Sequence, residues 1–220
     1  MTKDELLNKA VYVQYPLNYN VYKEYGIEGI NKLPLPEKGM MYDGYKLNHN
    51  HFRNEYHMKY SLPLFDSLLN FGYNENDFIK STRIIDGFEI PVLIPKTEYK
   101  YNISCFNDKE ELKDLSFNDI TSSNDNYSNI TGYHRLYKYP HKSSRLINKT
   151  LNNNRILFIS GDSQMIPDIG VLSCYFKEIW YIDNRNNILL SDKWNNIAFT
   201  DVLIELNCND LSRYIDNNFK

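Results

Sequence analysis

The last third of the chain alternates between continuous apolar runs and a helical spacing of apolar positions. Residues 155–160 form an apolar run that is typical of a strand buried on both faces. Residues 164–176 have helical spacing, with a proline in the first turn, where it is tolerated. Apolar runs at 177–183 and 201–206 predict two more strands, and residues 210–219 predict a closing helix. This order predicts a doubly wound α/β fold with a mostly parallel sheet.

The first third of the chain contains one predicted strand and one predicted helix. Residues 11–15 are rich in β-forming side chains and predict a strand. Residues 23–46 are interrupted by glycine and proline so often that they predict loop. Residues 54–71 have helical spacing and predict a helix that stops near Gly72, with Pro63 splitting or kinking it.

The middle of the chain is less regular. Residues 84–94 predict a β-hairpin, because an Asp-Gly pair separates two β-forming runs. Residues 107–131 are polar and predict a long surface loop. Residues 134–154 carry five Lys and Arg side chains and predict a solvated connector, with a contact to an anionic ligand as the alternative. We expect residues 1–220 to form a single domain with a less regular insertion at about 84–150.

Composition and charge exclude several classes of protein. The chain has 220 residues, of which 42% are hydrophobic and 15% aromatic, so it can bury a core, and wholesale disorder is excluded. The net charge is −3 and no run of Lys or Arg exceeds two, so a nucleic-acid-binding module fits poorly. The 29 Asn residues are spread along the chain, which lowers the weight of any single Asn in a motif.

Neither a membrane span nor an export leader is predicted. The apolar stretches are short, and the N-terminus is polar. Cys105, Cys174 and Cys208 have neither the spacing of a zinc site nor that of a disulfide framework. We therefore expect a cytoplasmic protein with reduced thiols. If the sequence is a piece of a longer exported chain, we expect a periplasmic or surface-associated one.

Gly161-Asp162-Ser163 stands where a buried strand is expected to turn into a helix. In doubly wound sheets, ligands bind beyond the carboxyl ends of the strands, where this tripeptide is placed. A serine near a helix N-terminus lies beside free backbone N–H groups that favour the oxyanion of acyl transfer. The segment therefore predicts either a serine nucleophile or an ordinary N-cap, since Asp and Ser are common N-cap residues.

A serine nucleophile needs a base, and the chain has five histidines. They are His49, His51, His57, His134 and His141. The first two form a His-x-His pair just before the predicted helix, and alternate residues of an extended chain face the same side. Three interpretations stay open: a catalytic histidine, a metal-binding pair whose third ligand has no telling spacing, and ordinary surface histidines.

Several of these segments together resemble a known family. Residues 155–163, 176–185 and 201–206 resemble the C-terminal half of the SGNH (GDSL-like) hydrolase superfamily. They are most similar to the branch of the alginate O-acetylation proteins, in which an Asp-x-His-Trp motif precedes the Gly-Asp-Ser motif. Residues 46–56 take the place of that motif here, so the order of the motifs is the same. The resemblance covers most of the chain and is poorest over residues 84–150.

The resemblance implies catalytic roles for individual residues. Ser163, with Asp162 in the same motif, would supply the nucleophile, and His51 would be its base. The position of the triad acid is occupied by His49, which cannot fix the tautomer of the base as a carboxylate does. A nearby acid such as Asp43 would then have to substitute, or the activity would be weak or absent.

The ends of two further predicted strands supply candidates for substrate binding. Arg185 belongs to an Asp-x-Arg pattern that recurs in this branch. It could steady an anionic intermediate or a substrate carboxylate, or it could only tie down a loop. Asn207 and Asn209 fall where SGNH enzymes carry a side-chain oxyanion donor, although the glycine of that block is missing here.

The resemblance implies a serine O-acyltransferase or acetylesterase that acts on a surface or capsular polysaccharide or its precursor. The transferase is slightly preferred, and no cofactor is needed beyond an acyl donor. The alternative is a catalytically inactive SGNH-fold protein that binds glycans or acts as a scaffold in polysaccharide biosynthesis, which His49 at the acid position favours. A metal-dependent hydrolase that uses His49 and His51 is the third hypothesis.

Overall fold

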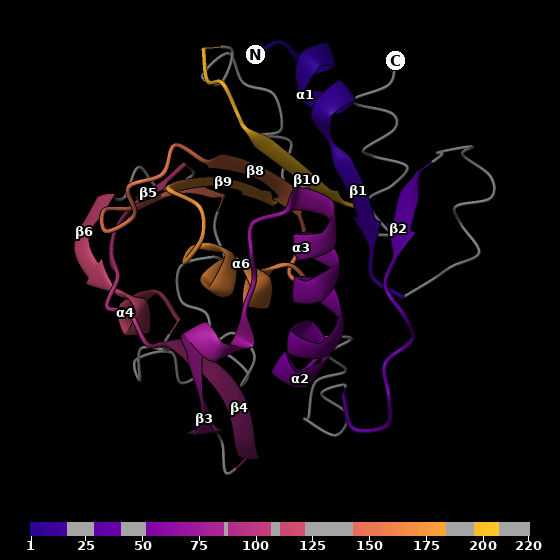
Figure 1. The fold of residues 1–220 in the computed structure, drawn as a ribbon, viewed down its shortest axis with the longest axis vertical. Coiled ribbons are helices and arrows are strands. Elements are labelled where there is room, and N and C mark those ends of the chain that lie inside the picture. The colour runs from indigo at the N-terminus through magenta and orange to yellow at the C-terminus, as the bar shows by residue number, and fades with distance from the viewer. Residues whose placement is uncertain are drawn as a thin grey trace.

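The computed structural model is built on an eight-stranded sheet, with a two-stranded hairpin beside it (Figure 1). It describes residues 1–16, 29–40, 52–85, 88–106, 111–121, 143–183 and 196–206. The order in the large sheet is β2-β1-β10-β8-β9-β7-β5-β6. Its strands are β1 (Val11–Gln14), β2 (Ile30–Lys32), β5 (Lys100–Cys105), β6 (Glu111–Ser116), β7 (Ser144–Asn148), β8 (Ile156–Gly161), β9 (Glu178–Asp183) and β10 (Asp201–Glu205).

Helices lie on both faces of the sheet. In Figure 1, α1 lies above the curved sheet, and α2, α3 and α6 lie below it. The helical elements of the described part are α1 (Lys3–Lys9), α2 (Asn54–Tyr56), η2 (His57–Ser61), α3 (Leu62–Leu69), η3 (Glu75–Asp77), α4 (Phe117–Thr121) and α6 (Ile166–Leu172). Helices on both faces of a largely parallel sheet make this an α/β fold, as the order of the apolar segments predicted.

The sheet is parallel in its centre and antiparallel toward one edge. Strands β2, β1, β10, β8 and β9 pair in parallel, and β7, β5 and β6 extend the sheet beyond β9 in antiparallel fashion. The chain runs from β8 through α6 into β9 on one side of β8, whereas β10 lies on its other side. The strand order therefore reverses at β8, and the carboxyl ends of β8 and β10 flank the point where α/β folds bind ligands.

Strand β8 is buried on both faces, as its continuous apolar run predicted. Leu157 and Ile159 pack into the core that includes α6, whereas Phe158 packs on the opposite face with Leu6 of α1. Successive side chains of a strand point to opposite faces, so one apolar run can supply two cores. This double burial fixes the position of Gly161, the last residue of β8.

The predicted helix at 54–71 is continuous but locally widened. Between α2 and α3 the chain makes a π-helical segment, η2, in which the N–H of Leu62 bonds to His57 O. Pro63 occupies the first turn of α3, where its missing N–H is tolerated. The proline thus marks a change of helix type rather than a break. The helix ends at Leu69 with Asn70 in the left-handed conformation, slightly before the stop expected at Gly72.

The hairpin predicted at 84–94 is confirmed and is longer than expected. β3 (Phe78–Ile85) pairs antiparallel with β4 (Phe88–Pro95), and Ile85 pairs with Phe88 across a two-residue connection. Figure 1 shows this hairpin projecting from the body below α4 and α6. Val92 and Leu93 are buried, so β4 contributes its side chains to the core next to α6.

Some short elements were missed or misplaced by the sequence pattern. Residues 111–121, expected to be loop, form β6 and α4, and residues 144–148, expected to be a connector, form β7. β6 lies at the sheet edge and is only partly buried, so its sequence lacks a strong apolar alternation. Three strands of the region predicted to be an irregular insertion thus belong to the large sheet. Helix α6 is also shorter than the predicted 164–176.

Candidate functional site

Buried polar side chains gather around the carboxyl ends of the central parallel strands. Strands β1, β10, β8 and β9 are neighbours in the sheet, and each ends in or is followed by polar residues that are at most 7% exposed. They are Gln14, Ser160, Asp162, Ser163, Gln164, Asp183 and Glu205. Buried polar groups must be satisfied by specific partners, so a cluster of them marks either a functional site or a demanding structural junction.

The turn that carries Ser163 is held by hydrogen bonds on both sides. The Asp162 N–H donates to Glu205 Oε2 at 2.7 Å, and Asp162 Oδ1 accepts from the Gln164 N–H at 2.7 Å. An aspartate that bonds to the backbone two residues on makes an Asx turn. Helix α6 starts only at Ile166, and its N-cap is Met165 without a side-chain cap. Neither Asp162 nor Ser163 is therefore the N-cap of α6.

Gly161 is required by the close approach of two neighbours to this turn. A Cβ at position 161 would lie 2.6 Å from Met165 Cγ and 3.3 Å from both Cβ and Oε2 of Glu205. A contact of 2.6 Å is far inside van der Waals distance, so any side chain here would displace Met165 or the turn. The glycine lets Glu205 of β10 reach the backbone of the residue before Ser163.

A second buried polar cluster joins the η2 segment to α6. Asp168 is fully buried, and its carboxylate accepts hydrogen bonds from Tyr15 Oη at 2.5 Å and Ser61 Oγ at 2.7 Å. His57 Nδ1 lies 2.9 Å from Asp168 Oδ2 and 3.2 Å from Ser61 Oγ. Burial, with the Asp168 charge as the second cause, holds the pKa of Tyr15 well above its ordinary value. Tyr15 thus remains a hydrogen-bond donor.

The tautomer of His57 follows from this arrangement. Because the Asp168 carboxylate can only accept, Nδ1 of His57 carries the hydrogen that points to it. The other ring nitrogen, Nε2, is buried with no hydrogen-bond partner among the described residues. The rings of Tyr15, Phe52 and Tyr56 surround the imidazole at centroid distances of 5.8–6.4 Å. A carboxylate behind a histidine is the arrangement that orients a general base.

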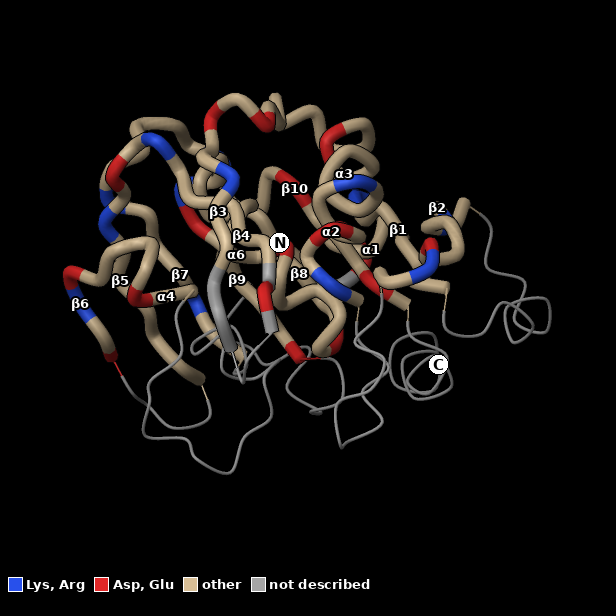
Figure 2. Tube along the Cα trace, turned by 90° about the horizontal axis from the view of Figure 1, so that it is seen from below, with Lys and Arg blue, Asp and Glu red and all other residues tan. Residues whose placement is uncertain are grey.

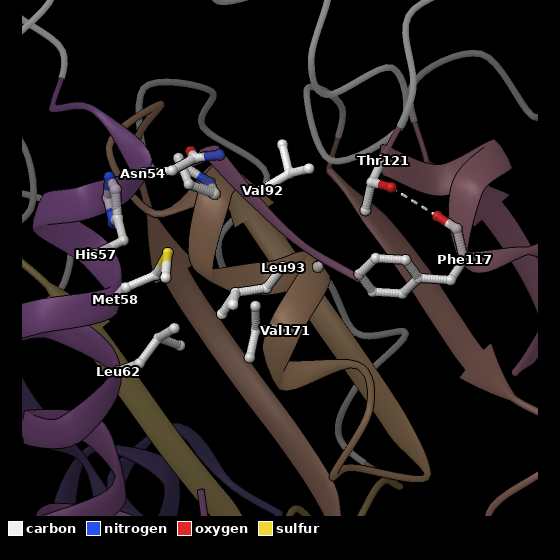
Figure 3. Close-up of a pocket in the computed structure, with 11 residues that line it drawn as sticks. Asn54, His57, Met58, Leu62, Val92, Leu93, Phe117, Thr121 and Val171 are labelled. Carbon is white, nitrogen blue, oxygen red and sulfur yellow. Dashed lines mark hydrogen bonds between the residues drawn. The ribbon is translucent and has the colours of Figure 1, made fainter. Parts of the chain in front are cut away.

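An apolar pocket lies between α6, the η2–α3 helix, β4 and α4 (Figure 3). Its empty volume is about 480 Å³, which includes open solvent. Figure 3 shows Met58 and Leu62 reaching from one side toward Leu93 and Val171, with the Phe117 ring entering from α4. Its polar margin is formed by Asn54, His57 and Thr121.

The structure describes only some of the candidate site residues that were predicted from the sequence. Ser163 and Asp162 lie in the turn after β8. His49, His51, Arg185, Asn207 and Asn209 lie outside the described residues, as does Asp43. The roles assigned to them stay predictions. In the described part of the chain, no three His, Cys, Asp or Glu side chains are grouped as a metal site would require.

Basic and acidic positions alternate along the outer elements of the described part, as the blue and red segments of the trace in Figure 2 show. In addition, none of the helices that the structure describes is long and apolar enough to cross a membrane.

Solved structures with this arrangement of strands and helices provide the comparison. A DHHW family protein from Eubacterium siraeum DSM 15702 superimposes with a TM-score of 0.61 at 14% identity, covering 96% of this chain and 84% of that one. Bacillus cereus PatB1 superimposes with a TM-score of 0.68 at 13% identity, covering 95% of this chain and 86% of that one. PatB1 with a sulfonyl adduct gives the same TM-score and coverage at 11% identity. The fold is shared.

The likeness is structural, because at these identities it shows the fold alone. No protein-family model matches the sequence, and a search of curated proteins finds no significant match. The α/β fold of this chain, with its large central sheet, is consistent with the SGNH-like architecture that the motifs predicted.

Sequence reasoning missed several buried polar residues near the candidate nucleophile. Glu205 could have been noticed, because it is the single charged side chain inside the apolar run Val-Leu-Ile-Glu-Leu. A charge within a buried strand needs a specific partner. Asp168 and His57 gave no such signal, because they lie far apart in the sequence and meet only when η2 packs on α6.

Proposed function

We propose that this chain is a serine-dependent O-acyltransferase or acetylesterase that acts on a carbohydrate, with Ser163 as the nucleophile. The observation that carries the proposal is the position of Ser163 in a hydrogen-bonded turn directly beyond β8, at the point where the strand order reverses. The order of its motifs, which resembles that of the alginate O-acetylation branch, supports acyl transfer. The fold shared with PatB1 and the DHHW family protein is compatible with it.

The proposed reaction passes through a covalent acyl-enzyme. The Ser163 hydroxyl oxygen attacks the ester carbonyl carbon, and its proton passes to the imidazole of His51. The alcohol leaves with that proton as the bond between its oxygen and the carbonyl carbon breaks. Water or a sugar hydroxyl then attacks the acyl group, breaks its bond to Ser163 and returns a proton to the serine oxygen. The Ser163 N–H, with Asn207, Asn209 or Arg185, stabilises the oxyanion.

The first test is loss of ester turnover in a Ser163→Ala variant. The purified protein should hydrolyse p-nitrophenyl acetate, and Ser163→Ala should reduce the rate at least about 10³-fold, because removing a nucleophile removes the covalent route. Ser67→Ala is the matched control, since Ser67 is exposed on α3 and bonds only to the carbonyl oxygen of Leu64 among its described partners. Circular dichroism would confirm that both variants are folded.

A reagent that labels nucleophiles separates an enzyme from a binding protein on the same fold. A sulfonyl fluoride should modify Ser163, as mass spectrometry of the peptide would show, and the label should be absent in Ser163→Ala. Equal turnover by wild type and Ser163→Ala, together with no labelling, would refute the proposal and favour the glycan-binding alternative.

The identity of the base can be resolved in the same assay. His51→Ala should lower turnover strongly if His51 takes the serine proton, and His57→Gln should then have the smaller effect. The opposite order would assign the base to His57, which already has Asp168 behind its Nδ1. A change in the pH profile of kcat/KM would distinguish loss of a base from loss of structure.

A further inference from the structure

Side chains of both neighbouring strands hold the backbone just before Ser163. From β10, Glu205 Oε2 accepts a hydrogen bond from the Asp162 N–H at 2.7 Å. From β9, Tyr181 Oη donates to Asp162 O at 3.1 Å and lies 3.4 Å from Gly161 O. Both side chains belong to residues that are 1% exposed, and their strands pair with β8 on its two sides. The turn is therefore held from both sides by buried polar groups.

The bond from Tyr181 reaches the peptide group that carries the Ser163 N–H. In a planar trans peptide the carbonyl oxygen and the N–H point in opposite directions, so a bond that fixes one fixes the other. Asp162 O accepts from Tyr181 Oη and also from the Met165 N–H at 3.2 Å. The direction in which the Ser163 N–H points is thus set by two donors on the far side of its own peptide group.

The same bond strengthens the Ser163 N–H as a donor. A hydrogen bond to a carbonyl oxygen polarises its peptide group, and such polarisation is passed along a chain of bonds more effectively in the interior than in water. The Tyr181 hydroxyl is buried, so its bond to Asp162 O lies in such an environment. An oxyanion on the Ser163 N–H would stand at the end of a chain that starts at Tyr181.

Tyr101 provides the comparison with a tyrosine of ordinary structural role. A buried tyrosine hydroxyl usually finds a partner whatever its function. Tyr101 is fully buried too, but its hydroxyl accepts from Ser173 Oγ at 3.2 Å, beyond the C-terminal end of α6. Tyr181 differs because it bonds to the backbone of the residue that precedes the candidate nucleophile.

We propose that Tyr181 is a positioning residue of the oxyanion site, whose hydroxyl orients and polarises the peptide group that carries the Ser163 N–H. The inference rests on the proposed function, because it needs a tetrahedral intermediate on Ser163. Tyr181 acts through the backbone in this role. The oxyanion develops only after the substrate has bound, so the loss of the hydroxyl should lower kcat and leave KM nearly unchanged.

The test is Tyr181→Phe, which removes the hydroxyl and keeps the ring. With p-nitrophenyl acetate, kcat should fall roughly tenfold and KM should change by less than about twofold, since losing an oxyanion donor outright costs about 10²–10³-fold and this variant only misaligns one. Tyr101→Phe is the matched control. It should lower the melting temperature by a similar amount, because it also removes a buried hydrogen bond, and it should leave both kinetic constants within about twofold of wild type.

A transition-state analogue reports on the oxyanion more directly. With 1,1,1-trifluoroacetone, the serine oxygen bonds to the carbonyl carbon, the π electron pair moves to the carbonyl oxygen, and the serine proton passes to the base. The adduct carries the oxyanion, so the inhibition constant should rise in Tyr181→Phe by about the factor by which kcat falls. It should stay unchanged in Tyr101→Phe.

The two proposals fail in different ways. If turnover depends on Ser163 but Tyr181→Phe and Tyr101→Phe have the same kcat, the positioning role is refuted and the proposed function stands. A fall in kcat without a rise in the inhibition constant would also refute the positioning role. So would loss of the folded circular dichroism spectrum in Tyr181→Phe, because the hydroxyl would then be a requirement of the fold. If Ser163→Ala is as active as wild type, the proposed function falls, and this inference with it.

Discussion

At the scale of single residues, the most demanding position in the described part is Asp168. It is fully buried, and its two carboxylate oxygens are hydrogen-bonded to Tyr15, Ser61 and His57. A buried carboxylate loses its hydration, so it is tolerated only when such donors replace the water. The cluster joins the end of β1, the π-helical segment and α6 through one side chain.

Replacing Asp168 should therefore be costly. Asp168→Ala leaves the hydroxyl of Tyr15 and the Nδ1–H of His57 buried without their acceptor, and we expect a loss of about 3–5 kcal/mol in the free energy of unfolding. Urea denaturation followed by circular dichroism measures it. Glu75→Ala, which removes an exposed partner of Lys80, should leave the midpoint close to that of wild type. Equal midpoints for the two variants would contradict a stabilising role for the buried cluster.

At the scale of elements, helix α1 depends on its first turn. Thr2 Oγ1 accepts from the Glu5 N–H at 3.2 Å, and the Glu5 carboxylate accepts from the Thr2 N–H at 2.7 Å, which is a capping box. With seven residues, α1 is too short to be stable by itself, so it relies on this cap and on Leu6, which packs against the sheet.

Removing the cap should loosen α1 more than the rest of the molecule. Thr2→Ala should destabilise the helix by about 1 kcal/mol, because one N–H group of the first turn loses its acceptor. Hydrogen exchange of the α1 amides should accelerate roughly fivefold, whereas the β8 amides should keep their rates. Thr2→Ser, which preserves the hydroxyl, is the matched control. Unchanged α1 exchange in Thr2→Ala would show that packing of Leu6 alone holds the helix.

How far each element could be predicted follows from how its stabilising contacts are distributed along the sequence. β8 was predictable because a strand buried on both faces has to be apolar throughout. β6 was not, since an edge strand needs few apolar side chains and owes its place to pairing with β5. The turn at Ser163 could be located from its motif, but its link to Glu205 could not, because that contact depends on β10 lying beside β8.

At the scale of the whole molecule, the thiols report on the integrity of the large core. Cys105 and Cys174 are buried, and both belong to the same core as α6. Burial raises the pKa of the Cys174 thiol to about 12. The native thiol is therefore protonated at neutral pH and unreactive, since only the thiolate attacks a disulfide reagent.

Thiol labelling should accordingly follow global unfolding. In a Cys208→Ser background at pH 8, a disulfide reagent such as DTNB should modify Cys105 and Cys174 only over the urea range in which circular dichroism is lost. Raising the pH to 9 should speed labelling of the unfolded chain, whose thiols have ordinary pKa values, and leave the folded chain nearly unreactive. Rapid modification in the absence of urea would show that this core opens locally.

The close approach at Gly161 has a consequence for how this sequence can change. Positions 161, 165 and 205 share one small volume, since a Cβ at 161 would overlap Met165 and press on Glu205. A larger residue at 161 should be accepted only together with a smaller one at 165 or 205. In a library randomised at all three positions, the surviving variants should therefore be correlated, and the loop that presents Ser163 would evolve as a unit with the neighbouring strand.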